Sequence, residues 1–318
     1  MLFGTREPFD YLLCHDCGAL TIRVVPADLD RHYPRAYHAG AGDIPERRRL
    51  GRMARQAERA AHAWRLFHRG RLVARLLRPW RPAMLQEVRL EADFVRRAGL
   101  RQFSDPILDV GCGRMPTRLA RLRRVGFTNL TGIDPWLDGD ASIDGIQLLR
   151  REIDDLEGQF QVVMFHHVFE HVADPEATLR AARRLLRPGG VVLIRTPVMG
   201  TWFWETYGRD WWELDPPRHL FVHSRRSLEM LIARVNLRIA EVIFDSTSVE
   251  IIASEQIRRN VAWREPQSWF VTPPAGFSDE DLARFLATTS ELNRSERGGR
   301  AAFYLRRADD LDSAGPRA

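Results

Sequence analysis

The spacing of hydrophobic positions changes near residue 100, and this change divides the chain into two predicted parts. Over residues 46–78, apolar residues recur at helical intervals with arginine between them, which predicts a helix that Pro79 ends. A second helix is expected over residues 83–98. We therefore expect residues 46–100 to form an Arg-rich helical cap.

From residue 101 onward, short apolar runs alternate with stretches of helical spacing. The apolar runs predict strands at residues 106–111, 129–134, 146–151, 160–167, 191–197, 238–245 and 301–306. The predicted helices lie at residues 115–126, 175–190, 225–235, 249–262 and 279–293. Strands that alternate with helices form a largely parallel sheet that helices cover on both faces. This pattern predicts an α/β domain over residues 101–307.

Three segments lie outside this alternation. Residues 1–45 are irregular in pattern, and residues 308–318 form a polar tail that we expect to be flexible. Residues 249–298 are helical in pattern and precede the last strand. We therefore expect them to be a helical insert within the α/β domain.

Composition bounds the class of protein. The chain has 318 residues, of which 44% are hydrophobic, enough for a sizeable core. The formal net charge is +6, but every cation is arginine, which indicates a GC-rich coding sequence as much as a nucleic-acid partner. We find no secretory signal and no apolar run of about 18 residues, so we expect a cytoplasmic protein without a transmembrane segment. The Arg-rich helix leaves room for weak peripheral contact with an anionic membrane, although a solvated helix packed on the domain is the more frequent case.

A glycine turn follows the first predicted strand. The stretch "ILDVGCG" places Asp109 in the strand, and Gly111 and Gly113 in the turn that leads into a helix. Glycines at this point let a ligand approach the backbone at the helix N-terminus. Asp134 closes the next strand, where an acid can accept hydrogen bonds from both hydroxyls of a ribose.

The same turn discriminates between two nucleoside cofactors. A dinucleotide site uses Gly-x-Gly-x-x-Gly, and Pro116 stands here in place of the third glycine. Asp109 would also bring a second negative charge to a pyrophosphate. S-adenosyl-L-methionine (SAM) carries a sulfonium and an ammonium group instead. The chemistry of the turn therefore favours SAM over NAD.

Several stretches together resemble one known family. They are "ILDVGCGRMP", "LTGIDP", "FQVVMFHHVFEHVADP", "LLRPGGVVLIRTP" and "WWELDPPRHLFVHSRRSLEMLIARVNL". Through them the chain resembles the class I SAM-dependent methyltransferases, of the branch called methyltransferase domain 23. The resemblance implies a Rossmann-like α/β fold with a seven-stranded mixed sheet, in the strand order 3-2-1-4-5-7-6, and helices on both faces.

The resemblance also implies which residues bind the cofactor. They are Asp109, Gly111, Gly113, Arg114, Asp134, Pro135, Trp136, Glu152, Ile153, Asp154 and His166. The glycine turn would hold the methionine end of SAM, and Arg114 could pair with its carboxylate. Asp134 would hold the ribose, and residues 135–136 and 152–154 would border the adenine.

Histidines supply the candidate catalytic groups. The resemblance places His166 and His167 at the end of the fourth strand, facing the sulfonium and the acceptor. His219, in "DPPRHLF", is the first choice as base or acceptor-orienting group, because a neutral imidazole can take a hydroxyl proton near pH 7. A structural role, such as a hydrogen bond to a backbone carbonyl, is the alternative for His219 and His171.

We expect a methyltransferase that acts on a small-molecule acceptor. Tryptophans within residues 202–212 suit stacking on a sugar or an aromatic acceptor, or packing as a lid. A sugar of a cell-envelope or secondary-metabolite pathway is the first candidate acceptor, and a quinone-like phenol is the second. One alternative is an RNA methyltransferase, for which no RNA-binding motif is visible, so we expect no nucleic-acid partner. The other is a non-catalytic SAM-fold binding module, which the unusual pair Arg114-Met115 favours.

The spacing Cys14-x-x-Cys17 resembles the second half of a zinc ribbon. Four ligands are needed, and the third cysteine of the chain, Cys112, belongs to the glycine turn. We therefore expect a truncated ribbon whose first half is lost or precedes the assigned start. The sequence predicts no stoichiometric zinc and no other metal site.

Overall fold

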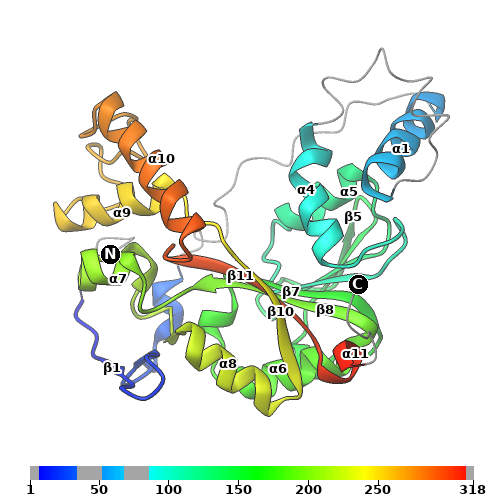
Figure 1. Ribbon diagram of the computed structural model, residues 1–318, viewed down its shortest axis with the longest axis horizontal. Coiled ribbons are helices and arrows are strands. Elements are labelled where there is room, and N and C mark those ends of the chain that lie inside the picture. Colours follow the sequence, from blue (N-terminus) through cyan, green and yellow to red (C-terminus); the bar gives the residue numbers. More distant parts are fainter. Residues whose placement is uncertain (1–6, 34–51, 68–85, 313–318) are drawn as a thin grey trace. The chain divides into compact units, whose positions relative to one another are not determined.

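The computed structural model describes residues 7–33, 52–67 and 86–312, and its contacts divide the chain into two compact units (Figure 1). Unit 1 consists of Met1–Pro34, His167–Glu176 and Ile194–Phe303. Unit 2 consists of Arg35–His166, Ala177–Leu193 and Tyr304–Ala318. Helices of the predicted cap and strands of the predicted α/β domain both belong to unit 2.

The largest sheet has eight strands in the order β10-β11-β8-β7-β3-β4-β6-β5. They are β3 (Ile107–Val110), β4 (Leu130–Ile133), β5 (Ala141–Ile143), β6 (Ile146–Leu149), β7 (Phe160–His166), β8 (Leu186–Pro197), β10 (Leu237–Phe244) and β11 (Arg300–Arg307). Without β5, this order is the predicted 3-2-1-4-5-7-6, so the predicted topology is confirmed. The chains of β8 and β11 run through both units.

The predicted count of seven strands is wrong, because β5 adds an eighth strand at the edge of the sheet. It pairs antiparallel with β6 across a turn at Asp144 and Gly145, which have positive φ values of 49° and 79°. Asp-Gly is a preferred sequence for such two-residue hairpins, so a signal was present. All three residues of β5 are exposed, and the strand therefore lacks a hydrophobic pattern.

The central strands of unit 2 are parallel, which brings their carboxyl ends to one edge of the sheet. β3 pairs with β4 and with β7, so that Asp109 lies beside Gly132 and Met164. β4 pairs in turn with β6. Every residue of β3 and β4 is buried, as expected for strands covered on both faces. Side chains that follow these strands therefore gather at the same edge.

Helices cover both faces of the unit 2 strands. α5 (Thr117–Val125) and α4 (Gln86–Arg97) pack together on one face, and α6 (Pro175–Leu185) lies on the other (Figure 1). α5 begins directly after Pro116 and ends at Gly126, whose φ of 126° suits glycine. These elements confirm the predicted alternation of strands and helices.

The Arg-rich helix α1 (Arg52–Phe67) packs within unit 2; the rest of the predicted range 46–78 lies outside the described residues. His62 is buried, and its Nδ1 donates a hydrogen bond to the carbonyl of Val125 at 2.7 Å. Phe67 makes edge contacts with Phe103 and Phe127, with ring centroids 5.0 and 6.2 Å apart. The apolar face of α1 is therefore occupied by packing.

Two predicted boundaries in the second half of the chain need correction. The helix predicted over residues 175–190 ends at Leu185, and β8 begins at Leu186 rather than at residue 191. A Cβ on Gly190 would lie 2.9 Å from the carbonyl oxygen of Arg187, three residues earlier, so the chain turns tightly here, with Gly189 at a φ of 72°, before the strand continues. The tail predicted to be flexible begins with a helix, α11 (Ala308–Asp312), and residues 313–318 are not described.

Unit 1 contains a three-stranded antiparallel sheet that the sequence pattern did not reveal. It joins β1 (Tyr11–Leu13), β2 (Leu20–Ile22) and β9 (Phe221–Val222) in that order. The prediction that residues 1–45 are irregular is therefore wrong for these two N-terminal strands. Each is three residues long, which is too short for alternation to be recognised.

The helices of unit 1 surround an aromatic core. They are α7 (Trp202–Tyr207), α8 (Arg225–Arg234), α9 (Ser248–Arg258) and α10 (Asp279–Arg294), together with short 3₁₀ turns at Leu29–His32, Phe169–His171, Gly208–Asp210 and Trp212–Leu214. α9 and α10, which form the helices of the predicted insert, pack on each other (Figure 1). Phe203, Tyr207 and Trp211 belong to the core beneath them. Capping boxes at Thr247 and Ser278 fix where the two helices begin.

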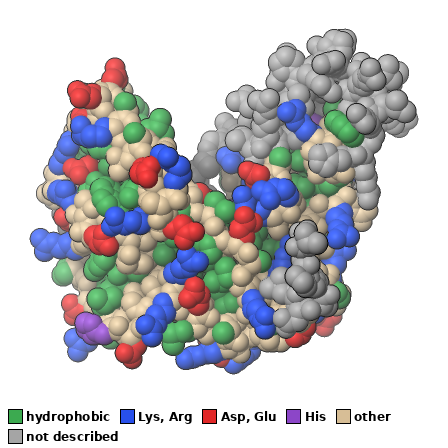
Figure 2. Space-filling model, in the orientation of Figure 1, with side chains coloured by type: hydrophobic (Ala, Val, Ile, Leu, Met, Phe, Trp, Pro, Cys, Tyr) green, Lys and Arg blue, Asp and Glu red, His purple; other side chains and the backbone are tan. Residues whose placement is uncertain are grey.

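The surface gives no sign of a membrane span or of one dominant charge. No helix in the described parts of the chain is long and apolar enough to cross a bilayer. On the face that Figure 2 presents, basic and acidic side chains are intermixed. This face therefore lacks the single-sign basic stripe that nucleic-acid binding favours.

Candidate functional site

The glycine turn of unit 2 forms an open cradle at the carboxyl end of β3. Gly111 and Gly113 both adopt left-handed backbone angles, with φ of 68° and 65°. A Cβ added to Gly113 would meet no atom within 4 Å, so the space above this residue is open. A ligand can therefore approach the backbone here as closely as the sequence motif requires.

Asp134 fixes the shape of the cradle. It is buried, its Oδ2 accepts a hydrogen bond from the backbone N–H of Gly113 at 3.0 Å, and its Oδ1 accepts one from Trp136 at 2.8 Å. A carboxylate offers about four acceptor positions, so each oxygen keeps one for a ligand hydroxyl. The position predicted to hold a ribose is thus an acceptor held in place by two backbone groups.

Asp109 is a buried acid beneath the same turn. Burial raises its pKa to about 7, the nearby Arg118 opposes this shift, and the charge of Asp134 adds to it. Arg118 is itself paired with the buried Glu91 at 2.7 Å, which reduces its effect on Asp109. A cationic ligand group above Asp109 would favour the ionised form.

Cys112, between the two glycines, is directed into the protein. A Cβ on Gly132 of β4 would lie 2.6 Å from the Cys112 sulfur, so the glycine makes room for this side chain. Burial, followed by the charges of Asp109 and Asp134, raises the pKa of the thiol. Cys112 is therefore a packing residue and not a reactive thiolate.

The remaining predicted cofactor residues differ in how they are placed. Arg114 is exposed and pairs with Asp138 at 2.8 Å. Pro135 is half-buried, and its carbonyl accepts a hydrogen bond from Arg150 at 3.3 Å. Trp136 is 59% exposed, so its indole face is available to a ligand.

Residues 152–154 lie at a short turn, Ile153–Asp155, after β6. Partial burial and the charge of Asp134 raise the pKa of Glu152, which places this carboxylate within electrostatic reach of the cradle. Ile153 is buried, and the carbonyl of Asp154 accepts a hydrogen bond from Arg184 of α6 at 3.1 Å. The segment is therefore held in place by a buried side chain and a hydrogen bond to α6.

These groups match what SAM would need from unit 2. The open space above Gly113 admits a ligand against the backbone, and the held carboxylate of Asp134 can accept from two hydroxyls. Asp109 supplies a buried anion for an ammonium or sulfonium group. The residues present thus fit the cofactor that the sequence predicts.

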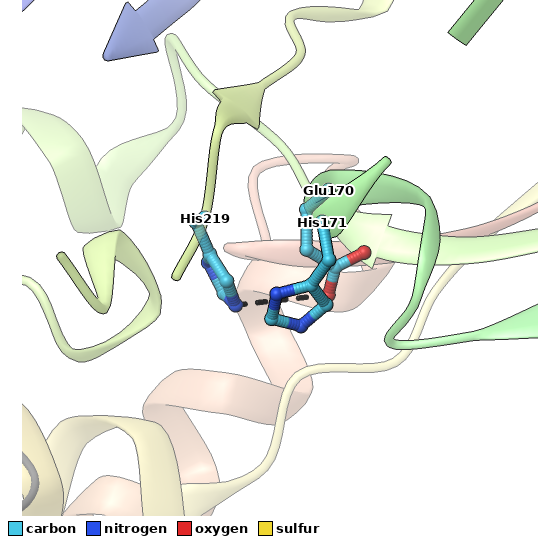
Figure 3. Close-up of side chains that lie close together, drawn as sticks. All are labelled: Glu170, His171 and His219. Atoms are coloured by element: carbon cyan, nitrogen blue, oxygen red, sulfur yellow. Dashed lines mark ion pairs between the residues drawn. The ribbon is translucent and has the colours of Figure 1, made fainter. Parts of the chain in front are cut away.

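Unit 1 contains a separate polar cluster of Glu170, His171 and His219 (Figure 3). One potential ligand atom of each lies within 4.8 Å of the others. Glu170 and His171 come from the turn Phe169–His171, and His219 comes from the loop before β9. The sequence proposed His219 as an acceptor-side residue, weighed His171 as mainly structural and missed Glu170.

Backbone carbonyls set the tautomer of both rings. His219 Nδ1 lies 2.7 Å from the carbonyl of Glu213, and His171 Nδ1 lies 2.9 Å from that of Arg218. A carbonyl only accepts, so Nδ1 must carry the proton in each ring. The Nε2 of each neutral imidazole is left with its lone pair. The structural hydrogen bond considered for His219 is present. It leaves Nε2 able to accept a proton or bind a ligand.

Glu170 is completely buried at the centre of the cluster. Its Oε2 accepts a hydrogen bond from Thr196 at 3.0 Å, and its Oε1 lies 3.9 Å from His219 Nε2 and 3.6 Å from His167 Nδ1. Burial would raise the pKa of Glu170, but its contact with His167 and its electrostatic interactions with His219 and His171 hold that pKa below its usual range. Burial, and then His219, lower the pKa of His171 to about 4.

His167 supports this cluster from a strained backbone position. Its φ of 55° lies in the left-handed region, and its backbone N–H donates to the carbonyl of Arg195 at 2.9 Å. The Arg195 guanidinium donates to His167 Nε2, which therefore acts as the acceptor and leaves the proton on Nδ1, toward Glu170. Burial lowers the pKa of His167, in agreement with a neutral ring.

The two adjacent histidines of the motif belong to different units. His166 ends β7 in unit 2 and is half-buried, whereas His167 opens the unit 1 segment His167–Glu176. The carboxyl end of β7 thus continues along the chain directly into the turn that carries Glu170.

The tryptophans of the acceptor-side loop mainly pack within unit 1. Trp211 is 1% exposed and lies in the aromatic core, and Trp202 packs against that core. Trp212 stacks on Trp263 with ring centroids 4.8 Å apart, and Trp263 stacks on Phe270 at 4.1 Å. The sequence allowed either ligand stacking or packing for this loop. Packing explains the position of Trp211.

The Cys14-x-x-Cys17 turn connects β1 and β2 and docks on another element of unit 1. The hydroxyl of Ser224, the N-cap of α8, donates to the carbonyl of Cys17. Hydrogen bonds from Cys17, the backbone one first, lower the pKa of the exposed Cys14. Within the described residues, the turn therefore serves as a docking element.

Comparison with known proteins gives one family match. A family model described as "Methyltransferase domain" matches residues 52–242. This range covers more than half of the chain and includes the cradle, the turn that carries Glu170 and the loop that carries His219.

Curated relatives and solved structures are similar over part of their length. "Ubiquinone biosynthesis O-methyltransferase" of Pseudomonas aeruginosa strain UCBPP-PA14 is 34% identical over 112 residues, covering 31% of this chain and 47% of the relative. The protein of the same name from Erwinia tasmaniensis is 29% identical over 119 residues, with 34% and 48% covered. The chain thus spans about half the length of the curated relatives it matches. Geranyl diphosphate C-methyltransferase from Streptomyces coelicolor A3(2) has 14% identity and a TM-score of 0.43, with 69% of this chain and 79% of that chain covered.

Proposed function

Because the chain belongs to the methyltransferase domain family, we propose that it transfers a methyl group from SAM to a hydroxyl oxygen of a small-molecule acceptor. The observation that carries this proposal is the open cradle above Gly113, with the held carboxylate of Asp134 on one side and the buried acid Asp109 beneath it. SAM is the methyl donor of this family.

The residues of unit 2 would each take one part of the cofactor. Asp109 and the two turn glycines receive the methionine end, and Asp134 accepts hydrogen bonds from the ribose. Trp136 and Pro135 cover the adenine, which the segment 152–154 borders. Arg114, which can leave its exposed pair with Asp138 at little cost, reaches for the carboxylate.

SAM supplies a methyl group already activated as a sulfonium. Transfer forms the new carbon–oxygen bond, breaks the carbon–sulfur bond and releases the hydroxyl proton. The chain must therefore align the acceptor, exclude water and receive a proton.

Unit 1 contains the candidate acceptor-side group His219. His219 offers a lone pair on Nε2 in a buried setting, so it can orient a hydroxyl and accept its proton. His167, fixed between Arg195 and Glu170, and His166, at the end of β7, would border the sulfonium and the acceptor. Their catalytic roles are proposals that rest on this placement.

Two classes of acceptor are candidates. A sugar hydroxyl is the first, and it is supported by the half-buried Trp212 and Trp263 of unit 1, whose rings stack on each other. A phenolic hydroxyl is the second, and it is favoured by the name O-methyltransferase in ubiquinone biosynthesis that the matched relatives carry. That name also supports oxygen, rather than carbon or nitrogen, as the accepting atom.

Calorimetry followed by a turnover assay tests the proposal. We expect the protein to bind both SAM and its demethylated product S-adenosylhomocysteine, and to release the product when supplied with a sugar or a catechol acceptor. If well-folded protein binds neither compound, the proposed function is wrong. Binding without turnover on any acceptor would favour the non-catalytic module, and turnover on RNA alone would favour the nucleic-acid alternative.

A further inference from the structure

The cluster of Glu170, His171 and His219 combines two imidazoles and a carboxylate at close range (Figure 3). In the close-up, the His219 ring is directed toward the other two side chains, and the dashed line joins its Nε2 to Glu170 Oε1 at 3.9 Å. Glu170 and His219 are both at least nine-tenths buried. This donor set is uncommon in a protein interior unless a cation or a proton relay uses it.

The two rings are held in the state that metal binding needs. A ligating histidine is neutral, presents a lone pair on one nitrogen and donates its other N–H to a carbonyl or carboxylate. The Nδ1–H groups of His171 and His219 point at the carbonyls of Arg218 and Glu213. The backbone therefore already provides the outer hydrogen bonds of two ligands.

The carboxylate contributes a buried oxygen without a close hydrogen-bond donor. Glu170 Oε2 is bonded to Thr196, whereas Oε1 has only a long contact with His167 Nδ1 at 3.6 Å and no closer donor in the part of the chain that the structure describes. A buried carboxylate oxygen without a donor is costly, because it has lost its hydration. A cation beside Oε1 would remove this cost.

From these observations we propose that Glu170, His171 and His219 bind a divalent first-row transition cation. Two imidazole nitrogens and one carboxylate oxygen suit Zn²⁺, Co²⁺ or Fe²⁺ better than the all-oxygen cations Mg²⁺ and Ca²⁺. Three protein ligands leave at least one coordination position for a water or an acceptor oxygen.

The side chains must move inward to bind one ion. Ligand atoms about 2.1 Å from one ion in a tetrahedral site lie roughly 3.4 Å from each other. His219 Nε2 and Glu170 Oε1 are 3.9 Å apart and need a shift of only a few tenths of an ångström, whereas the ligand atom of His171 lies within 4.8 Å of both. Asp215 Oδ2 lies 3.9 Å from the same nitrogen, but Asp215 is already paired with Arg218.

Two tyrosines of the N-terminal segment contact the two histidines of the cluster. Tyr11 of β1 donates to the carbonyl of His219 at 2.8 Å, and Tyr33 Oη lies 3.1 Å from His171 Nδ1. The N-terminal segment of unit 1 thereby holds both histidines. Such outer contacts keep ligands in position before the ion arrives.

Binding of the cation stands on the cluster alone, whereas its use in catalysis rests on the proposed methyl transfer. With an ion bound, His219 Nε2 is a ligand and no longer takes the hydroxyl proton itself. A bound ion would supply Lewis-acid chemistry at its open coordination position, where it would lower the pKa of an acceptor hydroxyl.

Titration with Co²⁺ tests the binding site directly. The full chain, freed of metal with EDTA, should bind one Co²⁺ per molecule and develop d–d absorption bands of low-symmetry Co²⁺. Glu170→Gln and His219→Ala should each weaken binding at least about 100-fold. His223→Gln is the matched control, because His223 is equally buried but bonds to Ser227 and lies outside the cluster.

The Cys14 and Cys17 thiols are a second potential source of metal binding and must be removed first. In a Cys14→Ser/Cys17→Ser background, we expect the cobalt stoichiometry and spectrum to persist. Loss of binding in this background, or binding that survives both Glu170→Gln and His219→Ala, would overturn the proposal. Circular dichroism and SAM calorimetry on each variant distinguish a lost ligand from a lost fold.

Turnover separates this inference from the proposed function. If the cation takes part, EDTA-treated protein should lose at least about 100-fold in rate, regain it with added metal, and bind SAM unchanged throughout. Full turnover without metal would leave His219 as the direct base and would refute a catalytic cation. Failure to bind SAM would refute the methyltransferase proposal without affecting the cobalt result.

Discussion

The cradle of unit 2 and the histidine cluster of unit 1 are built by different means. The cradle uses residues that directly follow neighbouring parallel strands, so strand pairing alone brings Gly113 and Asp134 together. The cluster joins a short turn to a loop that comes much later in the chain, and tertiary packing holds the two together. One site follows from local sequence and register, and the other depends on the fold of the whole unit.

The two regions also treat a buried carboxylate differently. In the cradle, burial raises the pKa of Asp109 to about 7, and the adjacent Asp134 adds to the effect. In the cluster, three histidines around Glu170 outweigh burial and keep its pKa low. The cradle is therefore prepared to gain a positive ligand, whereas the cluster holds an anion surrounded by neutral or positive donors.

Asp134→Ala should have the largest effect on SAM binding without changing the histidine cluster. This change removes the acceptor that positions Gly113 and Trp136 and, if Asp134 holds the ribose as proposed, two hydrogen bonds to the ligand. Charge-assisted hydrogen bonds are worth about 1.5–3 kcal/mol each, so SAM affinity should fall about 100-fold or more. Calorimetry with SAM measures this loss, and cobalt binding by the same variant should stay normal.

Asp138→Ala is the matched control for that variant. Asp138 lies on the same loop, is exposed and pairs with Arg114, so its loss should change SAM affinity by less than about threefold. Equal affinities for Asp134→Ala and the unaltered protein would mean that the ribose lies elsewhere. A simultaneous loss of cobalt binding would mean that the two regions are not independent.

A smaller effect is expected from pH, through Asp109. The charged groups that act on it are Arg118 of α5 and Asp134. Its pKa of about 7 in the free protein should fall when a cationic ligand binds, so affinity is complete above pH 7 and is lost as pH decreases through this value. Between pH 7.5 and pH 6 the SAM dissociation constant should rise about tenfold.

Asp109→Asn checks the origin of that pH dependence. The amide does not titrate, so the variant should bind SAM more weakly but with a nearly constant dissociation constant over the same range. A tenfold change that persists in the variant would assign the titration to another group, such as Glu152, whose pKa is also raised by burial and by Asp134.

The contrast between the regions explains what the sequence could predict. The strand order and the residues of the cradle follow from motifs in which each element lies next to its neighbour in the chain, such as Asp109 and Gly111. Glu170 carries no such signal, because a single acid between a phenylalanine and a histidine has no periodic meaning. Its role depends on His219, which packing brings to it.

Some short strands could not be predicted from the sequence, for a related reason. β1 and β2 contain three residues each, and β5 has no buried side chain, so hydrophobic periodicity could not reveal them. Trp211, considered for ligand stacking, is in the core because α7 and α9 enclose it. The residues next to Trp211 in the sequence do not indicate this packing. Long periodic segments were predicted well, and isolated side chains were predicted less well.

The smallest effect we predict belongs to Trp136, at the outer edge of the cradle. The side chain is 59% exposed and contributes little to packing, so Trp136→Ala should leave the free energy of unfolding nearly unchanged. If its indole covers the adenine, loss of stacking should weaken SAM binding by about 1 kcal/mol, or roughly fivefold, and Trp136→Phe should restore most of it. Equal SAM affinity in all three proteins would place the adenine against the 152–154 segment instead. Cobalt binding, which depends on unit 1, should be the same in all three, and a change there would show that the cradle and the cluster act as one site.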